Sequence, residues 1–310
     1  MTRAVVAQNY GGPEVLALQD IEIPELREGQ VLVDVRAAGT NPIDVKLYSG
    51  AMGQDPARLP MRLGLEAAGV VAAITPGATA YTGPLTVGDE VIVTNVDGTY
   101  ADQIVATAAE LGHKPAALSF PEAAGLVLAA GTAWHLLTKT GVGTGDTVLI
   151  HGASGGVGLM AVQLAVARGA TVIATASPGR HAQLREYGAE PVAYGDGLAD
   201  RVRAIGPVDV ALDLVGTDEA LDTSVELVAD RARIASIAGF ERGPELGIAV
   251  LSSADGGQEV RDAARPDIIA LAADGKLVVT VDRTFPLDEA AEAHRYLQTG
   301  HAGGKVVLVP

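Results

Sequence analysis

A glycine-rich segment in the middle of the chain limits its possible folds more than any other feature. Residues 148–158 read VLIHGASGGVG, with an apolar strand-like stretch before the glycines and a helix-like stretch after them. This order is typical of a dinucleotide-binding unit, whose fingerprint is G-x-G-x-x-G. Ala153 stands at the first glycine place, and Gly155 and Gly158 stand at the other two. Gly155 lets the backbone approach a pyrophosphate, and Gly158 lets the helix pack closely on the strand.

The next predicted strand indicates which dinucleotide binds. NAD-binding units usually carry an acidic residue about 20 residues after the glycines, which bonds the ribose 2′-hydroxyl. Here the strand ends in ATASPGRH (174–181), which contains no acid. Ser177 and Arg180 can instead hydrogen-bond and pair with a 2′-phosphate. The sequence therefore favours NADPH over NADH.

Strand-like and helix-like segments alternate after the glycine-rich turn, which predicts a parallel sheet with helical crossovers. Before it, short segments with a two-residue period, such as 31–36, 69–74 and 89–94, predict a β-rich domain. Ser119 and Glu122 predict a capped helix that runs to about Leu128. The later segments are expected as helices 157–168, 180–187, 217–228, 259–273 and 287–297, and strands 147–151, 170–176, 208–214, 233–237, 277–281 and 305–309.

Composition excludes several classes of function. The chain has 310 residues, enough for two domain cores, and its net charge of −16 argues against a sequence-independent grip on nucleic acid or anionic lipid. It contains no cysteine, which excludes disulfides, thiol nucleophiles and cysteine-ligated zinc. The sequence has no apolar segment long enough to predict a signal peptide or a membrane span. We therefore expect a soluble, cytoplasmic protein.

Several further motifs together resemble the medium-chain dehydrogenase/reductase superfamily, in its zinc-independent quinone oxidoreductase (zeta-crystallin-like) branch. They are AAGTNPID (37–44), GLEAAGVV (64–71), GDEV (88–91), AGTAW (130–134) and GKVVL (304–308). The resemblance implies an α/β fold with a GroES-like β-rich domain and a Rossmann domain with a doubly wound parallel sheet. The expected boundaries are 1–118 for the GroES-like domain, 119–256 for the Rossmann domain, and 257–310 for a C-terminal segment that completes the GroES-like domain.

The resemblance also indicates that the metal of the zinc-containing members is absent. Those members carry Cys at the place of Asn41, His at the place of Leu65, and Cys or Asp near Leu128. This chain has none of these ligands. Glu66 is the one potential metal ligand that remains among these motifs, and the six histidines show no HxH or HxxxH spacing. We therefore expect no metal site. The reaction that this leaves is hydride transfer to a quinone or to the C=C bond of an α,β-unsaturated carbonyl compound, because such a substrate already stabilises the developing negative charge.

By resemblance, the residues around NADPH can be assigned individually. Asn41 and Asp44 are expected beside the nicotinamide ribose, Thr132 at the carboxamide or ribose, and Phe240 over the nicotinamide. The loop residues Ser154, Gly155, Gly156 and Val157 are expected at the pyrophosphate. Ser177, Arg180 and Tyr194 are expected around the 2′-phosphate.

One departure concerns the proton donor. Many quinone oxidoreductases have Tyr at the place of Lys46, and this chain has Tyr48 two residues later. In an extended segment the two side chains share a face, whereas in a helix they diverge. Lys46 and Tyr48 are the candidate catalytic residues, and exposure of both to solvent is the alternative. His294, with Glu289 and Glu292, is expected on a solvated helix face.

Two other functions stay open. An enoyl-thioester reductase would need a basic rim for the pantetheine phosphates, which the acidic composition disfavours. A non-catalytic NADPH-binding module is the second alternative. We also expect a homodimer through the edge of the Rossmann sheet, because the apolar segment 246–251 follows the last regular strand.

Overall fold

The computed structural model describes residues 1–252 and 256–310. The chain forms two compact units. The first unit contains Met1–Leu128 and Val279–Pro310, and the second contains Ala129–Val278. These borders fall further along the chain than the expected 118/119 and 256/257. The reason is that α2 (Phe120–Ala124) packs on the sheet of the first unit, whereas α9 (Gly257–Ala273) packs near His135 in the second.

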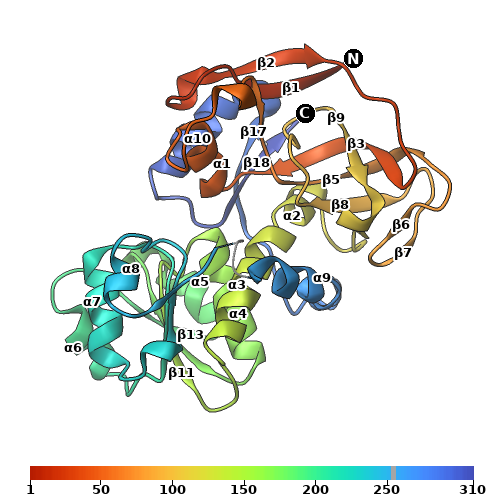
Figure 1. Ribbon diagram of the computed structural model, residues 1–310. Coiled ribbons are helices and arrows are strands. Elements are labelled where there is room, and N and C mark those ends of the chain that lie inside the picture. Colours follow the sequence, from red (N-terminus) through yellow and green to blue (C-terminus); the bar gives the residue numbers. More distant parts are fainter. Residues whose placement is uncertain (253–255) are drawn as a thin grey trace. The chain divides into compact units, whose positions relative to one another are not determined.

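The first unit is built around a seven-stranded sheet in the order β10-β8-β5-β3-β18-β17, with β9 paired to β3 (Figure 1). Its strands and helices are β1 Thr2–Ala7, β2 Leu16–Ile21, β3 Gln30–Gly39, α1 Pro42–Tyr48, β4 Met61–Arg62, β5 Glu66–Ile74, β6 Thr79–Ala80, β7 Gly83–Pro84, β8 Glu90–Thr94, β9 Gln103–Thr107, β10 Leu111–His113, α2, β17 Val281–Pro286, α10 Ala290–Gln298 and β18 Lys305–Val309.

The C-terminal strand completes this unit. Val307 and Leu308 of β18 pair antiparallel with Gly39 and Ala38 of β3, at the centre of the sheet. Inward residues such as Val33 and Val306 are buried in one hydrophobic core. The pairing places the first residue of β18 beside the end of β3, where the chain enters α1.

The second unit is a parallel six-stranded sheet in the order β13-β12-β11-β14-β15-β16. Numbered along the chain, this is the 3-2-1-4-5-6 order of the Rossmann fold. The elements are α3 Val127–Lys139, which begins in the first unit, β11 Thr147–His151, α4 Gly156–Ala167, β12 Thr171–Thr175, α5 His181–Glu186, β13 Ala189–Val192, α6 Leu198–Arg203, β14 Val210–Asp213, α7 Asp218–Leu227, β15 Ile234–Ser236, α8 Arg242–Glu245, β16 Ala249–Val250 and α9. The fold class expected from the sequence is therefore confirmed.

Two expected elements differ from the structure. The helix capped by Ser119 and Glu122 is present, with the Glu122 carboxylate accepting the Ser119 N–H, but it ends at Ala124 and α3 begins three residues later. The strand expected at 277–281 begins only at Val281, because Val278 N–H bonds the side chain of Gln163 instead of a neighbouring strand.

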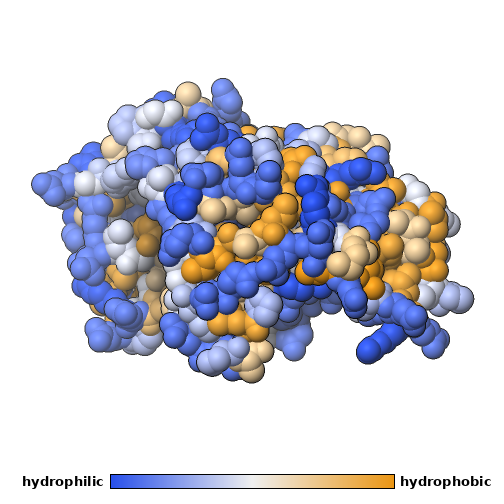
Figure 2. All heavy atoms as spheres, turned by 90° about the horizontal axis from the view of Figure 1, so that it is seen from above, coloured by the Kyte–Doolittle hydropathy of each residue, from blue (hydrophilic) through white to orange (hydrophobic). Residues whose placement is uncertain are grey.

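The surface reflects the composition. The face in Figure 2 carries many hydrophilic side chains with hydrophobic areas between them, as expected for a chain with 38 acidic residues. Within residues 1–252 and 256–310, no helix has the length and apolar character needed to cross a membrane.

Candidate functional site

The glycine-rich turn of the second unit forms a loop between β11 and α4. Gly155 N–H bonds the Gly152 carbonyl at 3.2 Å, and Gly155 is then the N-cap of α4. The first N–H groups of a helix have no partner within the helix, and they carry the positive end of its dipole. Ser154, Gly155, Gly156 and Val157 are all partly accessible at this point. The loop therefore offers backbone donors to an anion.

Two glycines of the loop differ in the space that an added Cβ atom would find. A Cβ on Gly158 would lie 2.4 Å from the Gly152 carbonyl oxygen and 2.7 Å from the Ala153 Cα. A Cβ on Gly155 would meet only the Gly152 oxygen, at 3.6 Å. Gly158 thus permits close packing of α4 on the loop, and Gly155 leaves open space for a ligand. Both observations fit the binding of a dinucleotide pyrophosphate.

The carboxyl ends of the neighbouring strands carry the candidate 2′-phosphate residues. Ser177 and Arg180 follow β12, and Tyr194 follows β13. The two strand ends are joined because Ala176 N–H bonds the Val192 carbonyl at 3.0 Å. Ser177 and Arg180 are half-buried, whereas Tyr194 is 60% exposed. The structure therefore brings these three residues to one edge of the sheet, next to the glycine-rich loop.

Exposed hydrophobic side chains mark the same edge. Tyr194, Val215 and Phe240 are exposed by 60%, 47% and 49%, and each lies just after the end of a parallel strand. Large apolar side chains left in water at the carboxyl end of a doubly wound sheet are typical of a ligand crevice. Thr132, on α3, is by contrast 9% exposed.

A pair of buried residues, Asp213 and Ser236, organises the loops of this edge, and sequence reasoning missed it. Asp213 ends β14 and accepts hydrogen bonds from the N–H groups of Val215 and Gly216 and from the Ser236 hydroxyl, the last at 2.5 Å. Ser236 Oγ in turn accepts hydrogen bonds from the N–H groups of Ala238 and Gly239, just before Phe240. The available signal was an acid at a strand end with a glycine three residues later, since Asx side chains commonly bond the backbone two residues on.

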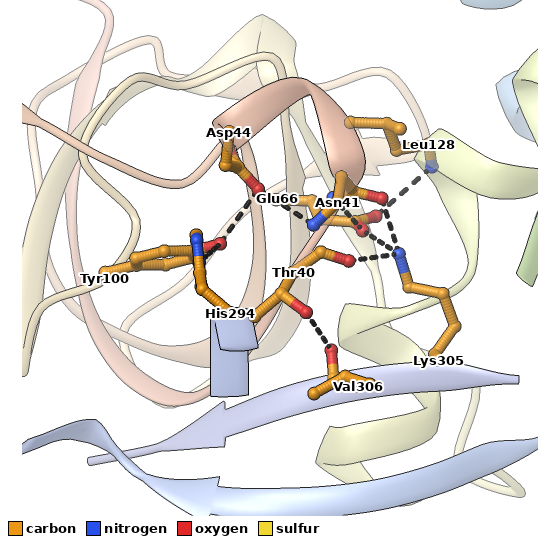
Figure 3. Close-up of polar contacts among 9 residues, drawn as sticks. All are labelled: Thr40, Asn41, Asp44, Glu66, Tyr100, Leu128, His294, Lys305 and Val306. Carbon is orange, nitrogen blue, oxygen red and sulfur yellow. Dashed lines mark hydrogen bonds and ion pairs between the residues drawn. The ribbon is translucent and has the colours of Figure 1, made fainter. Parts of the chain in front are cut away.

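In the first unit, a buried polar cluster surrounds Asn41 (Figure 3). The Lys305 ammonium donates to Asn41 Oδ1 at 2.6 Å, to Glu66 Oε1 at 2.8 Å and to the Thr40 carbonyl at 3.1 Å. Asn41 Nδ2 donates to the same Glu66 oxygen at 2.9 Å, and Glu66 Oε2 accepts the Leu128 N–H at 3.3 Å. The exposed fractions of Glu66, Lys305 and Asn41 are 1%, 4% and 5%. The charges are therefore paired and hydrogen-bonded away from water, as buried charges must be.

Asp44 supports the start of α1 next to this cluster. Its Oδ2 accepts the Asn41 backbone N–H at 2.8 Å and the Tyr100 hydroxyl at 2.8 Å, which is the capping arrangement of an N3 acid. Burial raises the pKa of Asp44 to about 7, and the bonds from Tyr100 and Asn41 oppose this rise. Asp44 Oδ1 has no hydrogen-bond partner among the described residues.

His294 extends the cluster and corrects an expectation. It is 0% exposed, and its ring nitrogens lie 3.2 Å from the hydroxyl oxygens of Tyr48 and Tyr100, so it does not belong to a solvated face. Burial lowers the pKa of His294 to about 4, which keeps the ring neutral at pH 7. The sequence signal was its place four residues after Ala290 and three before Leu297, on the apolar face of α10.

Lys46 and Tyr48 lie on a helix, α1, so their side chains point in different directions. Tyr48 is fully buried against His294, and its burial raises the pKa of the hydroxyl above its usual value. Lys46 is half-buried. The structure does not place the two side chains on one face.

The donor set does not suit a transition metal. Across the described residues, no three His, Asp or Glu side chains converge in a way that could hold a metal ion. The position of the family's metal-ligating Cys is taken by Asn41, and the one remaining carboxylate, Glu66, is already paired with the Lys305 ammonium.

Comparisons with known proteins agree with this fold. Residues 27–116 match the alcohol dehydrogenase GroES-like domain family, and residues 187–308 match a family described as zinc-binding dehydrogenase. A quinone oxidoreductase of Pseudomonas aeruginosa is 34% identical over 100% of both chains. An NADPH-dependent alkenal/one oxidoreductase of Arabidopsis thaliana is 32% identical over 99% of this chain and 79% of its own length.

A solved structure extends the match to three dimensions. The Escherichia coli quinone oxidoreductase, complexed with NADPH, has a TM-score of 0.85 and 28% identity, over 99% of this chain and 100% of its own. The sequence similarity spans both units, and the strand order of the second unit is that of a Rossmann fold. The chain belongs to the medium-chain dehydrogenase/reductase superfamily.

Proposed function

We propose that this protein is an NADPH-dependent oxidoreductase that reduces quinones or the C=C bond of α,β-unsaturated carbonyl compounds. The observation that carries the proposal is the absence of an acid after β12, where Ser177 and Arg180 stand, together with a glycine-rich loop shaped for a pyrophosphate. Relatives named as quinone and alkenal/one oxidoreductases support the same activity.

The proposed roles of the residues rest on the family resemblance, and the observed glycine-rich loop and strand ends support them. The loop N–H groups at Ser154, Gly155, Gly156 and Val157 bind the pyrophosphate, and Ser177, Arg180 and Tyr194 bind the 2′-phosphate. Asn41, Asp44, Thr132 and Phe240 surround the nicotinamide and its ribose, with Asp44 acting through the Asn41 backbone. Bound NADPH supplies the hydride. The remaining task of the chain is to orient the reactants and to stabilise negative charge on the substrate oxygen by hydrogen bonds.

This charge stabilisation sets the substrate class. Hydrogen bonds suffice for an enolate or a phenolate, whose charge is delocalised, but they stabilise a localised alkoxide less well. Activated alkenes and quinones should therefore react, and isolated ketones should react poorly. The test is a panel of ketones, enones and quinones with C4-deuterated NADPH. Saturated alcohols as the main products, with no enone or quinone consumed, would refute the proposal.

The proton that the product needs comes, in this proposal, from Lys46 or Tyr48. Half-burial of Lys46 supports the lysine, because the Tyr48 hydroxyl is buried against His294. Rates of Lys46→Met and Tyr48→Phe measured from pH 5 to pH 9 separate the two. If both variants keep the full rate at every pH, water is the donor.

We further propose a homodimer through β16. Among the described residues, β16 pairs only with β15 and so ends the sheet, and the apolar segment around it includes the buried side chains of Ile248 and Leu251. Pairing with the same strand of a second copy would cover the edge. Light scattering at micromolar concentration should give the dimer mass, and a monomer mass would refute this assembly.

A cytoplasmic location is also proposed, and cell fractionation tests it.

A further inference from the structure

Lys305 uses all three of its N–H donors inside the first unit. They reach the Thr40 carbonyl, Asn41 Oδ1 and Glu66 Oε1 at 3.1, 2.6 and 2.8 Å (Figure 3). The side chain is fixed at its base as well, because Lys305 is the first residue of β18 and Thr40 N–H bonds the Val306 carbonyl at 2.9 Å. The ammonium therefore has a defined position next to Asn41.

The two ends of the Asn41 amide face opposite charges. Oδ1 accepts from the ammonium of Lys305, and Nδ2 donates to the carboxylate of Glu66 at 2.9 Å. The oxygen and nitrogen of an amide are nearly the same size, so shape alone does not decide which way the group points. Here a rotation of the amide by 180° would place its NH₂ group against an ammonium and its oxygen against a carboxylate. Charge thus selects one orientation.

This arrangement leaves the amide with one N–H donor in a defined direction. Nδ2 has two hydrogens and gives one to Glu66. Oδ1 accepts from Lys305 and also faces the Asp44 backbone N–H in the capping arrangement of α1. The second Nδ2 hydrogen suits the oxygen of a ribose hydroxyl, which can accept it. We propose that Lys305 is a positioning residue of the cofactor site, which acts by fixing the orientation of the Asn41 amide; this rests on the proposed placement of Asn41 beside the nicotinamide ribose.

Glu66 holds the ammonium in place and is itself held at both oxygens. Its Oε1 accepts from Lys305 and Asn41, and its Oε2 accepts the Leu128 N–H. Removing Lys305 alone would leave this carboxylate buried without its cation, which is strongly destabilising, whereas removing both charges together is often tolerated. A test must therefore separate loss of folding from loss of amide orientation.

The experiment is a double-mutant cycle on NADPH binding, measured as Kd by fluorescence well below the melting temperature of each variant. Asn41→Ala should raise the Kd about tenfold, equivalent to about 1.4 kcal/mol. Lys305→Met should raise it about five- to tenfold, and so should Lys305→Met/Glu66→Gln, which removes the charges as a pair and keeps the protein folded. Lys305→Met/Asn41→Ala should bind no more weakly than Asn41→Ala alone, because Lys305 acts through Asn41.

Lys114→Met is the matched control. Lys114 is also a buried lysine of the first unit, 4% exposed at its side chain, and it pairs with Glu90 at 2.9 Å without touching Asn41. It should lose stability while its NADPH Kd stays within twofold of the wild type. Equal weakening in Lys114→Met would assign Lys305 a general structural role and overturn the inference, as would independent, multiplicative effects of Lys305→Met and Asn41→Ala.

The results also distinguish the inference from the proposed function. If Asn41→Ala weakens NADPH binding while Lys305→Met and Lys305→Met/Glu66→Gln do not, only the positioning role of Lys305 is wrong. If Asn41→Ala leaves the Kd unchanged, the placement of Asn41 at the cofactor is wrong, and the role of Lys305 is wrong with it.

Discussion

The two units arrange the polar groups of their candidate sites in opposite ways. The second unit uses backbone N–H groups at the start of α4 and leaves them accessible, with glycines that keep side chains away. The first unit uses side chains of Asn41, Glu66 and Lys305, which are almost fully buried and bond one another before any ligand arrives. The glycine-rich loop of the second unit therefore depends on the absence of side chains. The cluster of the first unit depends on buried charges that neutralise one another.

The largest effect should come from breaking this balance. In Glu66→Ala, the buried Lys305 ammonium loses its carboxylate, so the free energy of unfolding should fall by about 3–5 kcal/mol. Chemical denaturation measures it. Glu292→Ala is the control in the same unit, because Glu292 and Arg295 form an exposed pair whose loss should have little effect. A stability loss as small as that of the control would show that the first unit does not depend on charge balance.

In the second unit, the largest effect should come from adding a side chain at Gly158 in the glycine-rich loop. Gly158→Ala places a Cβ 2.4 Å from the Gly152 carbonyl oxygen, so α4 must move from the loop, and stability should fall by about 2–3 kcal/mol with loss of measurable NADPH binding. Gly143→Ala is the control, since nothing lies within 4 Å of its added Cβ. Calorimetry and NADPH titration together test this. Tight NADPH binding by Gly158→Ala would refute the role of close packing.

A single side chain at the edge of the second unit should have an intermediate effect. Arg180→Ala should weaken NADPH binding by about ten- to a hundredfold, or roughly 1.5–3 kcal/mol, because one charged contact to the 2′-phosphate is lost. NADH binding should hardly change. Arg185→Ala, which removes an exposed arginine from α5, is the control. Equal use of NADH and NADPH by the wild type would contradict the cofactor preference.

These two sites also differ in how far the sequence alone could predict them. The glycine-rich loop lies within eleven consecutive residues, 148–158, so its strand, turn and helix could be predicted together. Lys305 lies 239 residues from Glu66 and 264 from Asn41, and the pairing of β18 and β5 with β3 brings them together. No local pattern contains that information. His294 shows the same limit, because its partners Tyr48 and Tyr100 lie on distant segments.

A smaller, pH-dependent effect distinguishes the closed cluster further. The pKa of Asp44 is raised by burial to about 7 from an ordinary 3.8, so the folded state prefers the protonated acid. This contribution to stability is fully present below about pH 4 and is lost as the pH rises through about 7. Asp44→Asn cannot titrate. The melting temperature of Asp44→Asn relative to the wild type should therefore be higher at pH 8 than at pH 5.

Comparing Asp44→Asn with the wild type cancels the effects of the other titrating groups. Burial lowers the pKa of His151 and of His294 to about 4, so both histidines stabilise the fold increasingly as the pH rises from about 4 to 6.5, which is the opposite sign. They occur in wild type and variant alike. A difference in melting temperature that is the same at pH 5 and pH 8 would show that Asp44 is not protonated in the folded protein.

The smallest expected effect is that of a chelator. Glu66 stands where the family resemblance places a metal-binding region, but its Oε1 already accepts from the Lys305 ammonium at 2.8 Å and its Oε2 from the Leu128 N–H. A divalent cation would have to displace that ammonium and would then find Asn41 and Leu65 where thiolate and imidazole ligands are needed. Dialysis against a strong chelator should leave the rate of quinone reduction unchanged, with a zinc-dependent alcohol dehydrogenase as the positive control. A rate that falls and returns with added Zn²⁺ would mean that a metal ion binds at Glu66 in place of the Lys305 ammonium. The description of the first unit as a cluster of mutually paired charges would then be wrong.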